Sequence, residues 1–271
     1  MLVTKRFPLP ALTALLAVGA TLFSPLAFAQ AFDAVRLNGA LRGGDGGRVG
    51  AALISGRQYQ GSDERRTLLL PLLDYQWTNG WFAGTTNGIG YNFSSQPAMD
   101  FGARLTVDPG RNENRSNRLG GLGDIGIRPE LGGFYNYRLS DSVALTSSLR
   151  YGSGNDRNGL VIDIGAVYSV ALAPRWRLGL GVTATYANAN YMQSYFGVTP
   201  AQAVTSGYAP YTAGAGLRDI RAGAALTYIV NPKVAITTAL SASSLQGDAQ
   251  NSPLARQRNT LTGIVGASYA F

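Results

Sequence analysis

The stretch WRLGLGVTATYA, residues 176–187, alternates between two kinds of side chain. Trp176, Leu178 and every second residue onward to Tyr186 are apolar, whereas the residues between them are small, polar or basic. Because successive side chains of a β-strand point to opposite faces, the stretch predicts a strand with one apolar and one small or polar face. Its length also fits the roughly 9–11 residues of a tilted strand that crosses a bilayer.

The same alternation recurs along most of the chain beyond residue 45. A bacterial membrane barrel normally has an even number of strands, whereas the pattern gives an odd count, so one strand is missed or one segment is wrongly divided. The missing strand would lie within 31–45 or within 188–219. We therefore predict an all-β fold, a transmembrane antiparallel β-barrel of about 12 strands, with 10 as the alternative. The alternating segments are 47–55, 67–77, 81–93, 99–108, 127–139, 143–151, 160–172, 176–187, 220–230, 234–245 and 260–271.

Three features favour a membrane barrel over a soluble β-sandwich, which also alternates. The second face is rich in Gly, Ala, Ser and Thr, in a chain with 35 glycines and only 14% charged residues. Aromatic residues such as Trp77, Trp81 and Trp176 stand at segment ends, where girdles meet the membrane interface. The last segment is apolar on one face and ends in Phe271, and it must pair with the first because an open sheet edge in lipid is costly.

The ends and turns of the chain predict its location and orientation. Residues 1–29 resemble a secretory signal peptide, with Lys5 and Arg6, an apolar run and a cleavage site after Ala29. We expect 30–46 to be a periplasmic tether and 47–271 to be the barrel, in the outer membrane. Turns near 140, 174 and 232 are short and predicted to be periplasmic. The long segments 110–126, 152–159, 188–219 and 247–259 are predicted to face outward.

Composition excludes whole classes of function. The chain has no His and no Cys, so it has no His-containing triad, thiolate nucleophile or Cys-ligated metal. We expect no enzymatic activity, no cofactor and no metal. Beyond the leader, Lys233 is the only lysine and the arginines are spread over many segments, so we expect no nucleic-acid partner. The positive charge fits contact with membrane lipid and anionic lipopolysaccharide, or a basic lumen.

Charged side chains on the second face should point into the lumen, because a charge facing lipid at midplane costs about 2–4 kcal/mol. An anion-selective channel would use them as a charged lining. We favour an internal ion-pair network, since acids are interleaved with the arginines. The candidate residues are Asp100, Arg104, Arg128, Glu130, Arg138, Arg150, Asp163, Arg177 and Arg221.

The long segment 188–219 is unusually aromatic for an outer loop. Its aromatic side chains could form an adhesive or sensing surface. We favour the alternative that they pack on the barrel mouth or lie at the membrane interface. The residues concerned are Tyr191, Tyr195, Phe196, Tyr208 and Tyr211.

Short motifs spread over the chain resemble the MipA/OmpV family of Gram-negative outer-membrane proteins, the MltA-interacting proteins. The departures from the family pattern are Gln60, where an acid is usual, and the pair Gln250-Asn251. The matching motifs are GSD at 61–63, LPLLDY at 70–75, NGIGYN at 87–92, RLGGLGDI at 118–125, YMQSYFGV at 191–198, SG at 206–207, AGLRD at 215–219, LQGDA at 245–249, SPL at 252–254 and the final Phe271.

The resemblance implies a non-catalytic scaffolding or interaction protein of the outer membrane. By resemblance, its partners are a murein lytic transglycosylase and a penicillin-binding protein that synthesises peptidoglycan. Members are also discussed as porins, adhesins and stress-responsive proteins. The alternatives are therefore a narrow porin-like channel for small solutes and a surface adhesin or stress-response protein.

Overall fold

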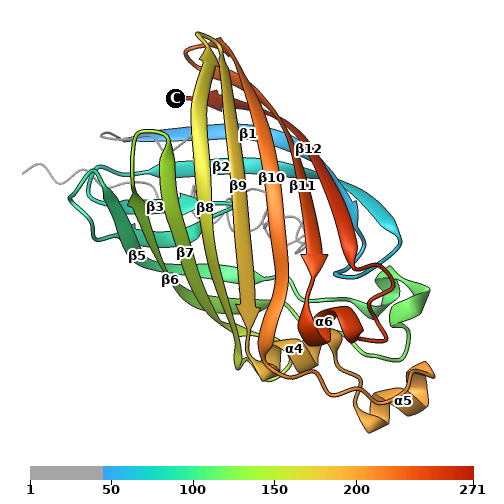
Figure 1. The fold of residues 1–271 in the computed structure, drawn as a ribbon. Coiled ribbons are helices and arrows are strands. Elements are labelled where there is room, and N and C mark those ends of the chain that lie inside the picture. Colours follow the sequence, from blue (N-terminus) through green and yellow to red (C-terminus); the bar gives the residue numbers. More distant parts are fainter. Residues whose placement is uncertain (1–44) are drawn as a thin grey trace, which may run out of the picture.

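The computed structural model describes residues 45–271, which form a closed barrel of twelve antiparallel strands (Figure 1). Each strand pairs with the next along the chain, and β1 closes the barrel by pairing with β12. The predicted fold and its twelve strands are confirmed. The predicted signal peptide and nearly all of the predicted tether lie outside the described residues.

Ten of the strands are long and two are short. The short pair is β3 (Trp81–Gly84) and β4 (Gly88–Asn92). The long strands are β1 (Gly46–Arg57), β2 (Arg65–Gln76), β5 (Met99–Asp108), β6 (Arg128–Arg138), β7 (Val143–Ser153), β8 (Gly159–Ala173), β9 (Trp176–Ala187), β10 (Gly216–Asn231), β11 (Val234–Leu245) and β12 (Asn259–Ala270).

The segment 81–93 was predicted as one strand, and this was wrong. It forms the β3–β4 hairpin, whose turn is 85–87. Gly88 follows Asn87 with a φ of +74°, a conformation that suits glycine. The Asn-Gly pair is a strong local signal for a hairpin, but the alternation of apolar residues runs through it. The twelfth strand therefore comes from this hairpin. The segment 188–215 contains helices and no strand.

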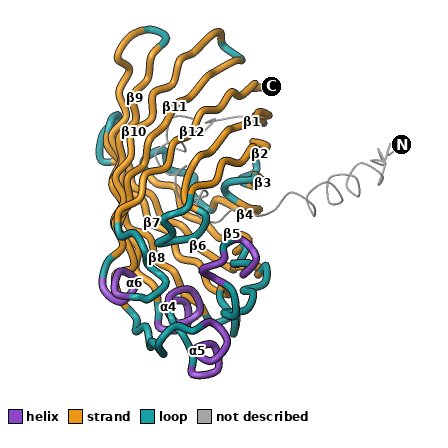
Figure 2. Tube along the Cα trace, turned by 90° about the vertical axis from the view of Figure 1, so that its right-hand side faces the viewer, coloured by secondary structure: helices purple, strands orange, loops and turns teal. Residues whose placement is uncertain are grey.

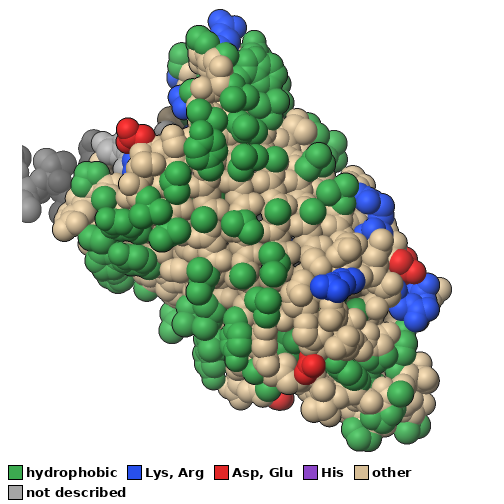
Figure 3. All heavy atoms as spheres, viewed as in Figure 1, with side chains coloured by type: hydrophobic (Ala, Val, Ile, Leu, Met, Phe, Trp, Pro, Cys, Tyr) green, Lys and Arg blue, Asp and Glu red, His purple; other side chains and the backbone are tan. Residues whose placement is uncertain are grey.

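The outer surface of the barrel is apolar. Leu69, Leu131 and Ile164 are each more than 60% exposed, and apolar side chains are spread over the wall in Figure 3. Such a continuous apolar belt is unfavourable in water and matches the lipid-facing surface of a membrane barrel. Trp81 packs on Tyr91, and Trp176 packs on Tyr228, in an aromatic girdle near one end of the wall. The barrel thus has the surface of a transmembrane protein.

The two ends of the barrel differ. At one end, which we call the turn end, short turns join the strands. The first strand begins there at Gly46 and the chain ends there at Phe271, and Gly47 and Phe271 exchange two backbone hydrogen bonds. At the other, the loop end, long connections carry helices (Figure 2). Within residues 45–271, no helix is long and apolar enough to cross a membrane. The elements at the loop end are η2 (Glu113–Arg115), η3 (Asn117–Leu119), α4 (Ala189–Phe196), α5 (Pro200–Ser206) and α6 (Gly247–Asn251).

The interior is divided into a charged part and an apolar part. Ion-paired side chains of β6 to β10 form the charged part. The inner face of β2 departs from the predicted polar lumen, because Leu68, Leu70 and Leu72 pack against a buried apolar patch. We call this set the inner apolar patch. Besides the three leucines it contains Ala52, Ile54, Ala225, Ala239 and Ile264.

Candidate functional site

Helices α4, α5 and α6, with the loops that carry them, form a cap over the loop end of the barrel (Figures 1 and 2). Local sequence explains both helices of the long loop. The Asn188 side chain accepts a hydrogen bond from the Tyr191 backbone and so begins α4. Thr199 and Gln202 form a capping box around α5, and Gly207 ends that helix in the left-handed conformation. Local sequence therefore determines where α4 begins and where α5 begins and ends.

The aromatic residues of α4 are buried. Phe196 and Met192 are completely buried, and Tyr191 and Tyr195 are more than 90% buried, among the apolar side chains of the cap. The Phe196 carbonyl accepts a hydrogen bond of 2.6 Å from the Ser252 hydroxyl, which ties α4 to the loop before β12. Of the other aromatic candidates, Tyr208 and Tyr211 are half-buried against the cap. The structure thus places all five aromatic candidates at the barrel mouth.

Tyr195 connects α4 to β5. Its hydroxyl lies 2.7 and 2.8 Å from the two carboxylate oxygens of Asp108, the last residue of β5. Arg111 donates a hydrogen bond of 2.9 Å to the Tyr195 carbonyl. Burial, and then the charge of Asp108, raise the pKa of Tyr195 well above its ordinary value, so the hydroxyl stays protonated and donates.

Tyr191 connects the same helix to β10. Its hydroxyl accepts a hydrogen bond of 2.9 Å from Arg218, whose guanidinium also lies 2.6 Å from Asp219. Arg218 is completely buried, although it is charged. Burying a charge is strongly unfavourable unless it is paired, so this contact requires both Tyr191 and Asp219. Gln60 completes the contact from the β1–β2 loop.

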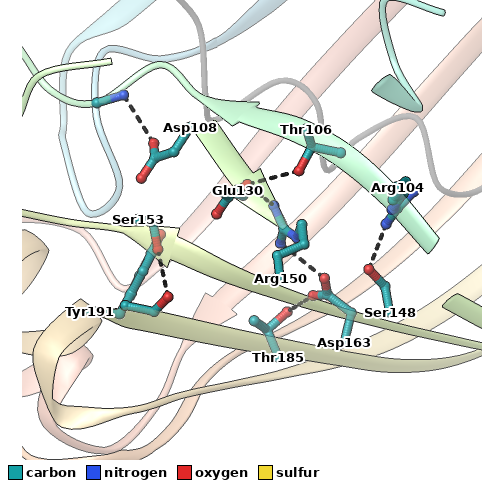
Figure 4. A network of polar contacts seen from close by, with 12 residues as sticks. Arg104, Thr106, Asp108, Glu130, Ser148, Arg150, Ser153, Asp163, Thr185 and Tyr191 are labelled. Carbon is teal, nitrogen blue, oxygen red and sulfur yellow. Dashed lines mark hydrogen bonds and ion pairs between the residues drawn. The ribbon is translucent and has the colours of Figure 1, made fainter. Parts of the chain in front are cut away.

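Below the cap, four charged side chains join β6, β7, β8 and β10, and Figure 4 shows three of them, Glu130, Arg150 and Asp163. Arg150 of β7 lies 3.0 Å from Asp163 of β8 and 3.7 Å from Glu130 of β6. Asp163 also pairs with Arg221 of β10 at 3.3 Å and accepts a hydrogen bond of 2.6 Å from Thr185. We call Glu130, Arg150, Asp163 and Arg221 the charged network. It contains four of the nine lumen candidates.

The other five lumen candidates also lie on inward-facing strand positions, but outside the charged network. Arg104 is buried and donates a hydrogen bond of 2.5 Å to Ser148. Asp100 accepts a hydrogen bond from Asn92 lower on the same side. Arg128 lies at the loop end of β6, beside the backbone of Gly126. Arg138 and Arg177 line a pocket of about 220 Å³ at the turn end, together with Asp141. The nine candidates therefore do not form one continuous site.

Several buried polar residues were missed by sequence reasoning. Arg218 and Asp219 are neighbours in sequence, so strict alternation would place them on opposite faces. A bulge between Leu217 and Asp219 in the pairing of β10 with β9 lets both side chains be buried. The predicted strand also began only at 220. The signal that could have identified this pair is its place within the family-like motif AGLRD.

The polar contacts of the site hold the cap on the barrel and hold neighbouring strands together. Cap residues bind β5 and β10, and the charged network binds β6, β7, β8 and β10. Within residues 45–271, no three His, Cys, Asp or Glu side chains gather as metal ligands. The loop end of the barrel is thus covered by a hydrogen-bonded and apolar cap, whereas the turn end presents a basic pocket.

Comparison with solved structures gives similar membrane proteins at low identity. The KdgM porin is 12% identical with a TM-score of 0.44, over 83% of this chain and 99% of its own. A NanC porin structure is also 12% identical, with a TM-score of 0.46, over 81% of this chain and 98% of its own. These scores are too low to carry an argument about activity. No curated protein matches the sequence.

Comparison with family models is decisive. Residues 49–271 match the model described as MltA-interacting protein MipA, which includes the barrel from β1 to the last residue of the chain. The match extends over the capped loop end, the charged network and the basic pocket alike. The chain therefore belongs to the MipA family of MltA-interacting proteins.

Proposed function

We propose that the protein is a non-conducting outer-membrane anchor that docks an enzyme of the cell envelope at its turn end. The observation that carries the proposal is the cap: Phe196, Met192 and Arg218 are fully buried across the mouth of the barrel. A barrel built for free diffusion needs an open mouth, whereas this one has its mouth filled by packed side chains. An exported chain with short turns at the periplasmic side would present the turn end to the periplasm.

The turn end has the chemistry of a docking surface for an acidic partner. Arg175, Arg177 and Lys233 are exposed there, and Arg138 lines the same pocket as Arg177. Asp141 is the acid that shares this pocket. Basic surfaces of this kind accelerate and orient association with an oppositely charged protein. By family resemblance, the partner is a murein lytic transglycosylase, held near a penicillin-binding protein.

Co-purification from detergent-solubilised membranes tests the docking. The full chain should recover the transglycosylase, and the double variant Arg175→Ser, Arg177→Ser should recover about fivefold less, since rim charges contribute up to ~1 kcal/mol each. Arg256→Ser, an exposed arginine of the loop end, is the matched control and should leave recovery unchanged. Equal recovery with all three proteins would contradict docking at the turn end.

Conductance across a planar bilayer tests the non-conducting part. The purified barrel should add no steady current at physiological salt, because the cap fills the mouth with packed side chains and the charged network occupies part of the lumen beneath it. A steady anion-selective current whose selectivity is lost when Arg138 and Arg177 are both replaced by Ser would instead support the narrow channel with a basic lining.

A further inference from the structure

The barrel wall is interrupted beside β2. β2 has twelve residues, but it pairs with β3 only through Asp74, Tyr75 and Gln76. β3 and β4 have four and five residues, and β4 pairs with β5 no higher than Leu105. Within residues 45–271, no strand therefore pairs with this side of β2 along 65–72 or of β5 along 106–108.

This interruption has four borders, and we call it the lateral window. Its sides are 65–72 of β2 and 106–108 of β5, and its lower border is the β3–β4 turn at 85–87. Its upper border is a bridge between two loops: Arg118 pairs with Asp63 at 3.0 Å, and Gln58 donates a hydrogen bond to the Arg115 carbonyl. Because the loops close the top, the window opens sideways into the membrane.

The backbone of β2 at the window is adapted to having no neighbouring strand. Leu73 bonds to Thr85 across the last pairing below the window, so by alternation Leu69 and Pro71 direct their backbone groups into it. Unpaired backbone groups in lipid are costly. Pro71 has no N–H and so removes one of them, which is why proline is tolerated at sheet edges. Pro71 also withholds a donor that a strand from another protein would need, so the edge is poorly suited to adding a strand.

Inside the window, the surface on the β2 side is apolar. Leu68, Leu70 and Leu72 point inward from β2 and belong to the inner apolar patch, in which Ile54 is fully buried. On the β5 side, the inward residues Thr106 and Asp108 are already hydrogen-bonded to Glu130 and Tyr195. The window thus connects the hydrocarbon of the membrane to an apolar strip on the inner wall.

The upper corner of the window is basic. Arg66, the inward residue at the loop end of β2, and Arg115 of η2 are both half-buried. Gly56 pairs with Arg66, and Gln58, two residues farther along the chain, bonds to the Arg115 carbonyl, so both arginines lie at this corner. Burial and then the charge of Arg66 lower the pKa of Arg115. Neither forms an ion pair with an acid of the described chain. Asp124 acts on Arg115 from a distance, but its oxygens accept hydrogen bonds from Asn112 and Glu113.

We propose that the lateral window is a binding site for an anionic lipid of the surrounding membrane. One acyl chain enters sideways and lies against Leu68, Leu70 and Leu72, while its phosphate pairs with Arg66 and Arg115. Along the membrane normal, the arginines lie nearer the loop end than the leucines do. This matches a membrane lipid, whose phosphate lies at the membrane surface and whose acyl chain extends toward the middle of the wall. The inference requires that the barrel spans a membrane, and it does not depend on the docking of an enzyme at the turn end.

Photo-cross-linking in vesicles tests the site. Benzoylphenylalanine replaces Leu70 in the full chain, with Leu72 as a second inward position, and folding is checked by the altered gel migration of an unheated barrel. The outward residue Leu69 is the lipid-facing reference, and the inward Thr183 of β9 is the control away from the window. Vesicles contain phosphatidylcholine alone, or with added phosphatidylglycerol, or with added lipid A.

In anionic vesicles, we expect the yield of lipid adduct at Leu70 to be at least about fivefold higher than at Thr183. The double variant Arg66→Gln, Arg115→Gln should lose most of this excess. An excess with phosphatidylglycerol or with lipid A identifies which anionic lipid binds. Equal adducts in phosphatidylcholine and anionic vesicles would refute the role of the arginine pair. Adducts at Leu70 and Leu72 no higher than at Thr183 would refute the site.

Discussion

Replacing Asp163 by Asn removes the centre of the charged network with little change in side-chain volume. Asp163 holds Arg150 at 3.0 Å, Arg221 at 3.3 Å and the Thr185 hydroxyl at 2.6 Å. Arg221 and Thr185 share one carboxylate oxygen and Arg150 contacts the other, so an asparagine oxygen can keep the contacts of only one of the two oxygens. The amide nitrogen would then face a guanidinium that also only donates. The variant thus leaves at least one buried arginine short of its closest acceptor.

The size of the loss in free energy of unfolding depends on which acids still face Arg150 and Arg221 in the variant. Removing one member of a buried ion pair typically costs about 3–5 kcal/mol. Here each arginine keeps a more distant acid, since Arg150 lies 3.7 Å from Glu130 and Arg221 lies 3.7 Å from Asp219. We therefore expect a loss near the lower limit, about 3 kcal/mol of the free energy of unfolding.

Guanidinium titration of the barrel in lipid vesicles, followed by tryptophan fluorescence, measures this loss. Asp141→Asn, at an exposed acid of a turn, is the matched control and should change stability by less than about 0.5 kcal/mol. Combining Asp163→Asn with Arg150→Gln should cost less than the sum of the two single changes. A loss below about 1 kcal/mol for Asp163→Asn would refute the network as a source of stability.

Three further predictions concern the cap, the hairpin and pH. Tyr195→Phe deprives the buried Asp108 of its 2.7 Å partner and should lower the free energy of unfolding by about 1.5–3 kcal/mol in the same titration; a smaller loss contradicts the junction. Gly88→Ala places a Cβ 2.1 Å from a backbone oxygen of β5, whereas Gly207→Ala meets nothing within 4 Å at a similar φ. The first should cost about 1–3 kcal/mol more than the second, and equal costs would show that the hairpin yields freely. Burial raises the pKa of Tyr59 to about 12, whereas an unfolded tyrosine ionises near its ordinary value of 10.0. Stability should therefore fall as pH rises from 10.0 to about 12, and this fall should be smaller in Tyr59→Phe; identical pH profiles would contradict it.

Alternation predicted most of the barrel because each strand has one face in lipid and one face inside. This is why 176–187 predicted β9 with the bounds that the structure gives. The pattern failed at 81–93, where the period of two continues across the β3–β4 turn and conceals it. It also says little at 68–73, LLLPLL, because β2 is apolar on both faces beside the inner apolar patch.

The contents of the site were less predictable than the fold. Sequence could place Arg150, Asp163 and Arg221 on inward faces, but the pairing among them depends on strand register. Register across β7, β8, β9 and β10 includes shifts at three of the connections, and each shift changes which side chains meet. The pairing of Arg218 with Asp219 depends on such a shift and could not be read from alternation.

The window and the charged network make separable demands on one barrel. The interrupted wall leaves β2 paired along its whole length with β1 but only through Asp74, Tyr75 and Gln76 with β3, so β1 and the loop bridge must hold its position. The charged network stiffens β6 to β10, whereas the window lies between β2 and β5 and shares no side chain with it except through Thr106. Asp163→Asn should therefore lower global stability while leaving the lipid adduct at Leu70 unchanged, and Arg66→Gln with Arg115→Gln should do the reverse. If both variants changed both measurements together, the interior would have to be one coupled unit, and the division into a rigid wall and a lateral lipid site would be wrong.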